Sequence, residues 1–192
     1  MTEFPHGSQP PARSGSLGAD SQDLSHFYYF AYGSCMCPVD LKRSLGEHTH
    51  PYVVGAATLK GYRLGFFRRS RRRNCGVLDV VPDASSTVEG VLYRLPWRLS
   101  GPLDEREEGY CHTLVTVACK TQSIGNVRTY TVLEKHDQEL APNDWYFTVV
   151  MRGATTCGLP EDYCWKLFQH MHHLQTTAQL IPLTANSMAL VS

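Results

Sequence analysis

The stretch FYYFAYGSCM (residues 27–36) is dense in aromatic side chains and then changes abruptly to Gly-Ser-Cys-Met. Aromatic residues in an apolar run predict a buried β-strand over residues 27–32. The glycine that follows lets the chain turn sharply and lets a ligand approach the backbone closely. These residues therefore predict either a loop whose backbone N–H groups hold an anion or a tight structural turn.

Length and charge limit the classes of function. The chain has 192 residues, enough for one domain with a sizeable core. Eighteen Lys and Arg residues balance eighteen Asp and Glu residues, so no global charge favours nucleic acid or an anionic membrane. We see no signal peptide and no apolar run of about 18 residues. We therefore expect a soluble protein with neither a membrane nor a nucleic-acid partner, and the oligomeric state stays open.

The cysteines and histidines give no pattern typical of a metal site. The seven cysteines form an odd set, without paired CxxC motifs, and we interpret them as reduced, mostly packing thiols of a cytoplasmic protein. In the run HMHH, His170 and His173 share a helix face, whereas His172 does not. No carboxylate stands at a matching spacing, so we expect structural or solvent-facing histidines and no metal.

Composition divides the chain into three parts. Residues 1–25 are rich in Gly, Ser, Pro and Gln and predict a disordered tail, because they offer too little apolar surface to offset the entropy of ordering. We expect one domain over residues 26–175 and a C-terminal extension over 176–192.

Within the expected domain, short segments rich in Val, Tyr and Phe and bounded by turn residues predict strands at 27–32, 52–59 with 62–67, 76–81, 88–95, 110–119 and 127–133. Helix signals are fewer, and they fall at 38–45, from Ser100 as N-cap to Gly109, at about 143–156, and from Pro160 to about His173. Many short strands with late helices indicate an α+β fold with a small, mostly antiparallel β-barrel and flanking helices.

The acidic run LDEREEGY (residues 103–110) contains a candidate functional carboxylate. Helical spacing puts Glu107 on the same face as Leu103, four residues earlier. If Leu103 points to the core, Glu107 is the carboxylate most readily drawn into an apolar setting, where it would be a stronger base than in water. The alternative is that the run forms a solvated helix face.

Five motifs, in this order, resemble those of the γ-glutamylcyclotransferase-like superfamily: YFAYGSCM, VEGVLYRL, LDEREEGY, VRTYTV and GLPEDY. The resemblance extends from about Phe27 to Leu167. The signature loop of that superfamily is usually Tyr-Gly-Ser-Asn, so Cys35 stands here in place of the Asn. The resemblance implies a compact α+β fold with a small barrel, and its characterised enzymes release 5-oxoproline from γ-glutamyl compounds.

The resemblance also implies roles for particular residues. The catalytic glutamate falls on Glu107, and Glu108 is the alternative because this sequence has one extra residue there. The residues implied to bind the substrate are Tyr32, Gly33, Ser34, Cys35, Tyr130 and Tyr146, with Trp145 as an alternative to Tyr146.

The implied reaction explains these residue types. The α-amine of a γ-glutamyl group must attack the γ-carbonyl, yet near neutral pH it is mostly an ammonium ion, with a pKa of about 8 in a free terminus. A carboxylate can take its proton and return it to the leaving amine. Backbone N–H groups of residues 33–35 could serve the oxyanion or the substrate's α-carboxylate. We expect no cofactor, because nucleophile and electrophile belong to one molecule.

Several alternatives remain open at this stage. The protein could bind a γ-glutamyl ligand without turnover, since Cys35 replaces an amide that both donates and accepts hydrogen bonds. It could remove a γ-glutamyl group within a biosynthetic pathway. The Cys35 thiol could itself be the nucleophile, although no Cys-His spacing supports this.

The run RRSRRR (residues 68–73) has three interpretations. It is a solvated, mobile connection between strands, a loop at the mouth of a pocket that recruits an anionic γ-glutamyl substrate, or a contact for nucleic acid. The lack of interleaved aromatic residues argues against the last.

Overall fold

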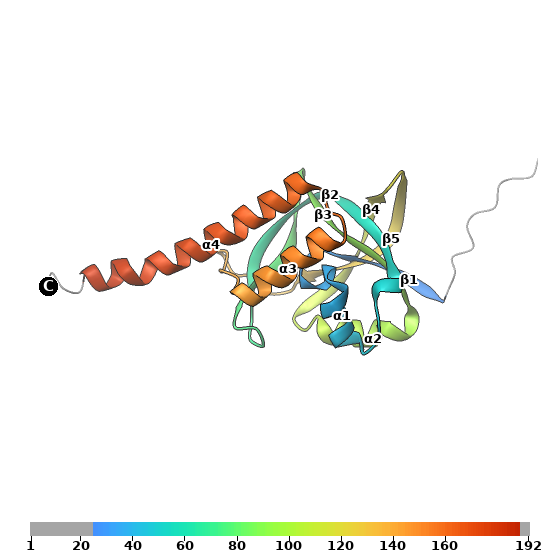
Figure 1. Cartoon of the computed structure of the whole chain (residues 1–192), viewed down its shortest axis with the longest axis horizontal. Coiled ribbons are helices and arrows are strands. Elements are labelled where there is room, and N and C mark those ends of the chain that lie inside the picture. The colour runs from blue at the N-terminus through green and yellow to red at the C-terminus, as the bar shows by residue number, and fades with distance from the viewer. Residues whose placement is uncertain (1–24, 189–192) are drawn as a thin grey trace, which may run out of the picture.

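The computed structural model describes residues 25–188, and its centre is a closed β-barrel (Figure 1). The five strands follow the order β1-β3-β2-β4-β5, with bounds β1 His26–Ala31, β2 Val53–Ser70, β3 Cys75–Pro96, β4 Tyr110–Cys119 and β5 Gln122–Val132. Every neighbouring pair is antiparallel except β1 and β5, which meet in parallel at Tyr29 and Arg128. The predicted α+β class with a mostly antiparallel barrel is therefore confirmed.

One long hairpin, β2–β3, forms much of the barrel wall and corrects the predicted strand count. The segments expected to be separate strands are joined, 52–59 with 62–67 in β2, and 76–81 with 88–95 in β3. In the pairing of β2 with β3, Lys60 pairs with Thr87 and Tyr62 pairs with Pro82, so the register skips Gly61 on β2 and residues 83–86 on β3. Gly61 has φ +80°, which suits glycine at a bulge. The turn residues that suggested two breaks therefore bend one continuous hairpin.

Across residues 25–188, four α-helices and three 3₁₀ turns flank the barrel. The helices are α1 Pro38–Leu45, α2 Ser100–Arg106, α3 Asp144–Thr156 and α4 Glu161–Met188, and the turns are η1 Ser34–Met36, η2 His50–Tyr52 and η3 Trp97–Leu99. Figure 1 shows α1 and α2 together at one end of the barrel, α3 lying across it, and α4 continuing well beyond it. Within residues 25–188, no helix is long and apolar enough to span a membrane.

The ends of three elements differ from the prediction. Ser100 is not an N-cap: the chain enters α2 from η3, Leu99 takes the cap position, and the Ser100 hydroxyl accepts a hydrogen bond from Arg128 instead. Helix α4 does not end near His173 but continues to Met188. The third is β5, which begins at Gln122, earlier than the expected residue 127.

The three-part division of the chain stays a prediction. The tail expected over residues 1–25 lies, except for its last residue, outside the described part of the chain. The expected boundary between residues 175 and 176 falls inside α4.

The turn η1, which follows β1, is held by the barrel. Tyr93 of β3 is completely buried, and its hydroxyl donates hydrogen bonds to the backbone oxygens of Cys35 (3.1 Å) and Met36 (3.0 Å). Ser34, Cys35 and Met36 are all buried as well. The glycine loop at the end of β1 is therefore held firmly in position by the barrel.

Candidate active site

A cavity of about 620 Å³ lies beside the glycine loop, and its volume is typical of sites that hold small molecules. Its walls come from η1, the β2–β3 turn, the α2–β4 junction, β5 and α3. The cavity brings together all the site residues expected from the sequence: Tyr32, Gly33, Ser34, Cys35, Glu107, Glu108, Tyr130 and Tyr146. Trp145, the alternative to Tyr146, is not among the lining residues and is 42% exposed.

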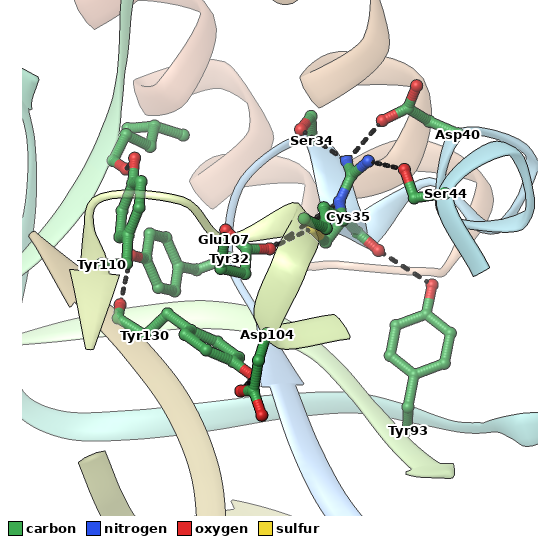
Figure 2. Close-up of polar contacts among 12 residues, drawn as sticks. Tyr32, Ser34, Cys35, Asp40, Ser44, Tyr93, Asp104, Glu107, Tyr110 and Tyr130 are labelled. Atoms are coloured by element: carbon green, nitrogen blue, oxygen red, sulfur yellow. Dashed lines mark hydrogen bonds and ion pairs between the residues drawn. The ribbon is translucent and has the colours of Figure 1, made fainter. Parts of the chain in front are cut away.

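Glu107 faces the glycine loop. Leu103 is completely buried, as the helical spacing required, and the Glu107 side chain directly after α2 is only 14% exposed. The Cys35 thiol donates a hydrogen bond to Glu107 Oε1 at 2.9 Å (Figure 2). Glu108, in contrast, is exposed, and its backbone oxygen accepts a hydrogen bond from Arg68 at 2.7 Å. Geometry thus distinguishes two carboxylates that are adjacent in sequence.

Arg106 is a buried cation that the sequence analysis missed. Its side chain is 4% exposed and forms an ion pair with Asp40 of α1, with Nη2 and Oδ2 2.6 Å apart. The same guanidinium donates to Cys35 Sγ (2.9 Å) and contacts the hydroxyls of Ser34 and Ser44. The only sequence signal was a single arginine within an acidic run, which is more typical of a solvated helix face. Arg106 ties η1, α1 and the end of α2 together.

Cys35 connects Arg106 to Glu107, accepting a hydrogen bond from the first and donating one to the second. Burial raises the pKa of the Cys35 thiol to about 12, although the charge of Arg106 acts in the opposite direction. The thiol is therefore neutral near pH 7, which disfavours its use as a nucleophile. A neutral thiol both donates and accepts here, the same two functions that the amide of an Asn would offer.

Tyr32 and Tyr130 form a chain of hydrogen bonds along one wall. The Tyr32 hydroxyl donates to the backbone oxygen of Tyr130 at 2.5 Å, and the Tyr130 hydroxyl donates to Asp104 Oδ1 at 2.5 Å. Burial raises the pKa of both phenols, so both stay protonated near neutral pH. Since both protons are engaged with the protein, these two tyrosines mainly shape the wall.

Tyr146 differs from Tyr32 and Tyr130 because its hydroxyl accepts a hydrogen bond, which leaves the hydroxyl proton available to a ligand. Its oxygen accepts a hydrogen bond from the Leu78 backbone N–H at 3.0 Å, and burial raises the pKa of the phenol. A Cβ atom on Gly33 would lie 3.0 Å from this hydroxyl oxygen. Tyr146 therefore approaches the glycine loop closely and holds a proton that it can donate nearby.

The arginine run forms the end of β2 and its turn into β3, at the edge of the cavity. Arg68 and Arg69 lie on β2, and Arg71, Arg72 and Arg73 follow in the turn. All five line the cavity. From the sequence, a connection between strands and a loop at the mouth of the pocket were alternatives. In the structure one segment is both, and we call its five arginines, Arg68, Arg69, Arg71, Arg72 and Arg73, the arginine rim.

The histidines of α4 lie apart from the cavity lining. His170 contacts Glu139, with Nε2 and Oε2 3.0 Å apart, and packs edge-on against Phe66. His172 stacks on Phe168. Among residues 25–188, no group of three or more His, Cys, Asp or Glu side chains could hold a metal ion.

Comparison with known proteins adds family evidence to this geometry. A family model described as the AIG2-like family matches residues 87–167. The putative gamma-glutamylcyclotransferase YkqA of Bacillus subtilis is 34% identical over 158 residues, which cover 80% of this chain and 55% of that protein. Its crystal structure matches with a TM-score of 0.71 over 78% of this chain and 55% of that one. The gamma-glutamylcyclotransferase of Mus musculus is 26% identical over 81% of this chain and 85% of that protein.

The barrel, the position of the glycine loop and these matches define the class of protein. The chain belongs to the γ-glutamylcyclotransferase-like superfamily. It spans 55% of the length of the Bacillus subtilis relative.

Proposed function

We propose that the protein is a γ-glutamylcyclotransferase-type enzyme, which converts a γ-glutamyl amide to 5-oxoproline and releases an amine or amino acid. The observation that carries this proposal is the Glu107 carboxylate, largely buried in the cavity wall and anchored by the Cys35 thiol beside the glycine loop. A carboxylate held in this way is suited to move protons between two nitrogen atoms of one small substrate.

In the proposed reaction, Glu107 takes a proton from the substrate's α-ammonium group. The freed amine attacks the γ-carbonyl carbon, and a new C–N bond closes the five-membered ring. The original amide C–N bond then breaks as Glu107 returns its proton to the leaving nitrogen. The second proton lost by the α-nitrogen also ends on the released amine, which is an ammonium ion in water, so protons balance. Cys35 and Arg106 hold Oε1, and within residues 25–188 no hydrogen bond or ion pair engages Oε2.

Substrate binding is assigned to the loop Tyr32–Cys35 and to Tyr146. Gly33 leaves the backbone open to close approach, and the Tyr146 hydroxyl near it can donate to a substrate oxygen. Donors fixed in a partly dry site stabilise a developing oxyanion without reorganising. The rigid position of η1 serves ring closure because the enzyme mainly has to hold the glutamyl chain in its reactive rotamer.

The test is 5-oxoproline release, measured by mass spectrometry, from glutathione, γ-glutamyl amino acids and γ-glutamyl amines. Removing a general acid–base typically costs about 10²–10⁴-fold. We therefore expect Glu107→Gln to lose at least about 100-fold in kcat/KM, while the matched neighbour Glu108→Gln changes little. The reverse pattern would assign catalysis to Glu108.

A binding module without turnover is the second candidate, and Cys35 in place of the usual Asn favours it. Its signature would be thermal stabilisation by γ-glutamyl compounds without any release of 5-oxoproline. If Cys35→Asn then gained release, the cysteine would explain the lost activity. Release by the wild type, dependent on Glu107, would exclude this candidate.

A further inference from the structure

The arginine rim is the largest cluster of basic side chains in the sequence, with five of the eighteen Lys and Arg residues. Among residues 25–188, none of these five arginines forms an ion pair with a carboxylate. The cavity's two other cations differ in this respect, because Arg106 pairs with Asp40 and Lys135 pairs with Asp79. The positive charge of the cavity is therefore concentrated at the rim.

Two rim arginines are used to hold the walls of the cavity. Arg68 donates to the backbone oxygens of Glu108 (2.7 Å) and Gly109 (3.3 Å), directly after the candidate catalytic carboxylate. Arg73 lies over the ring of Tyr146 in the wall formed by α3, 5.9 Å from the ring centroid. The rim thus reaches from the Glu107 side of the cavity to the Tyr146 side.

The other three arginines are exposed to solvent. Arg69 donates to Asn74 in the following turn, and within residues 25–188 no hydrogen bond or ion pair joins the side chain of Arg71 or Arg72 to another residue. An exposed guanidinium can swing to a ligand at little cost, and its planar fork matches a carboxylate or phosphate with two hydrogen bonds. Such a group at the mouth of a cavity meets the part of a ligand that projects outward.

Charge in the cavity supports an acidic ligand. Seven Lys and Arg side chains line it against four carboxylates, at positions 105, 107, 108 and 134. Two of the seven are neutralised by Asp40 and Asp79, which are not among the lining residues, so five cations, all of the arginine rim, stand against the four carboxylates. Every γ-glutamyl substrate has the same glutamyl α-ammonium and α-carboxylate, so only the leaving amine can use an additional set of cations.

We propose that the arginine rim selects γ-glutamyl compounds whose leaving amine carries at least two acidic groups, for example γ-glutamylglutamate. This inference rests on the proposed function, because it takes Glu107 as the inner end of the cavity and the rim as its outer end. Arg71 and Arg72 are the specificity-determining residues, because within residues 25–188 neither side chain has a hydrogen bond or ion pair to give up. The acid can be a carboxylate or a phosphate.

The test compares substrates of equal size that differ in charge. We expect kcat/KM for γ-glutamylglutamate to exceed that for γ-glutamylglutamine by about tenfold or more, mainly through a lower KM. The preference should shrink as salt is raised. The pair γ-glutamylphosphoserine and γ-glutamylserine measures the gain from a phosphate, and comparing this gain with that of the glutamate and glutamine pair shows which acid is preferred. In the double variant Arg71→Gln/Arg72→Gln, the ratio of kcat/KM for the acidic substrate to kcat/KM for its neutral counterpart should fall close to one for each pair.

A matched control is the double variant Arg43→Gln/Arg152→Gln. It removes the same net charge from exposed helix positions that do not line the cavity, and it should keep the wild-type ratios. The inference is overturned if the wild type shows no preference for the acidic members, or if both double variants change the ratios equally.

Failure of the proposed role of the arginine rim can be distinguished from failure of the proposed function. Release of 5-oxoproline that depends on Glu107 but ignores leaving-group charge would reject only the role of the rim. If no substrate is turned over, calorimetric binding of γ-glutamylglutamate and γ-glutamylglutamine to the wild type decides the inference. Tighter binding of the acidic member, lost in Arg71→Gln/Arg72→Gln, would support it, and equal binding would reject it.

Discussion

Arg106 and the exposed pair Arg71 and Arg72 line the same cavity in opposite environments. The Arg106 side chain is 4% exposed and its guanidinium contacts Asp40, Ser34, Ser44 and Cys35. Arg71 and Arg72 lie in a surface turn, and neither forms an ion pair with another residue of the range 25–188. The inner arginine fixes the geometry on which chemistry depends, whereas the outer pair can adapt to what enters. The same residue type therefore serves positioning in one region and recognition in the other.

The largest expected effect of this contrast is on stability. Arg106→Met would leave Asp40, which is 6% exposed, without its cation, and breaking a buried pair in this way typically costs about 3 kcal/mol or more. Arg71→Met should change the free energy of unfolding by no more than about 0.5 kcal/mol. Urea denaturation measures both. Adding Asp40→Asn to Arg106→Met should recover part of the loss, and equal losses for the two single variants would remove the contrast.

The next effect is a pH dependence that belongs to the inner wall. A thiol in the unfolded chain loses its proton near pH 8.5, whereas burial raises the pKa of folded Cys35 to about 12. The folded state therefore binds this proton more tightly, and its contribution to stability is complete below about pH 8.5 and is lost as the pH rises towards 12. At pH 10 the wild type should have lost about 2 kcal/mol more than Cys35→Ala. Parallel stability curves would contradict this, and Cys111→Ala, at an exposed position on β4, is the control.

The smallest effect concerns the hydrogen bond between Cys35 and Glu107. Cys35→Ala removes the donor to Oε1 and should lower kcat by about tenfold with less change in KM, because a hydrogen bond to a charged group is lost. Cys35→Asn keeps a donor and an acceptor and should stay closer to the wild type. The measurement is 5-oxoproline release under saturating substrate. A fully active Cys35→Ala enzyme would show that the thiol does not position Glu107.

Sequence reasoning predicted the parts of the site that lie in ordered motifs. The glycine loop and Glu107 could be placed together because the motifs match a superfamily and because Leu103 predicted a buried helix face. Arg106 could not be predicted, since its role depends on Asp40 and Ser34, which lie more than sixty residues away in sequence. The function of the Cys35 thiol depended in turn on Arg106.

The fold shows the same division between local and distant causes. Strand-forming residues in the chain predicted the barrel class, and Asn143 caps α3 through its side chain where a helix start was expected. The continuity of β2 and β3 could not be predicted, because Gly61 and residues 83–86 carry ordinary turn signals. Only closure of the barrel makes a bulge more favourable there than a break.

The parallel contact between β1 and β5 has a consequence for the order of assembly. The residues that meet, Tyr29 and Arg128, are about one hundred positions apart, so closure requires a large loop to form first. Contacts at such long separation are formed slowly. On a ribosome, the cavity cannot be complete until β5 has emerged, since Tyr130 is part of its lining. Closing the barrel is therefore a late event, the cavity is completed only after α3 has added Tyr146, and a chain truncated before β5 would lack both the closed barrel and the cavity.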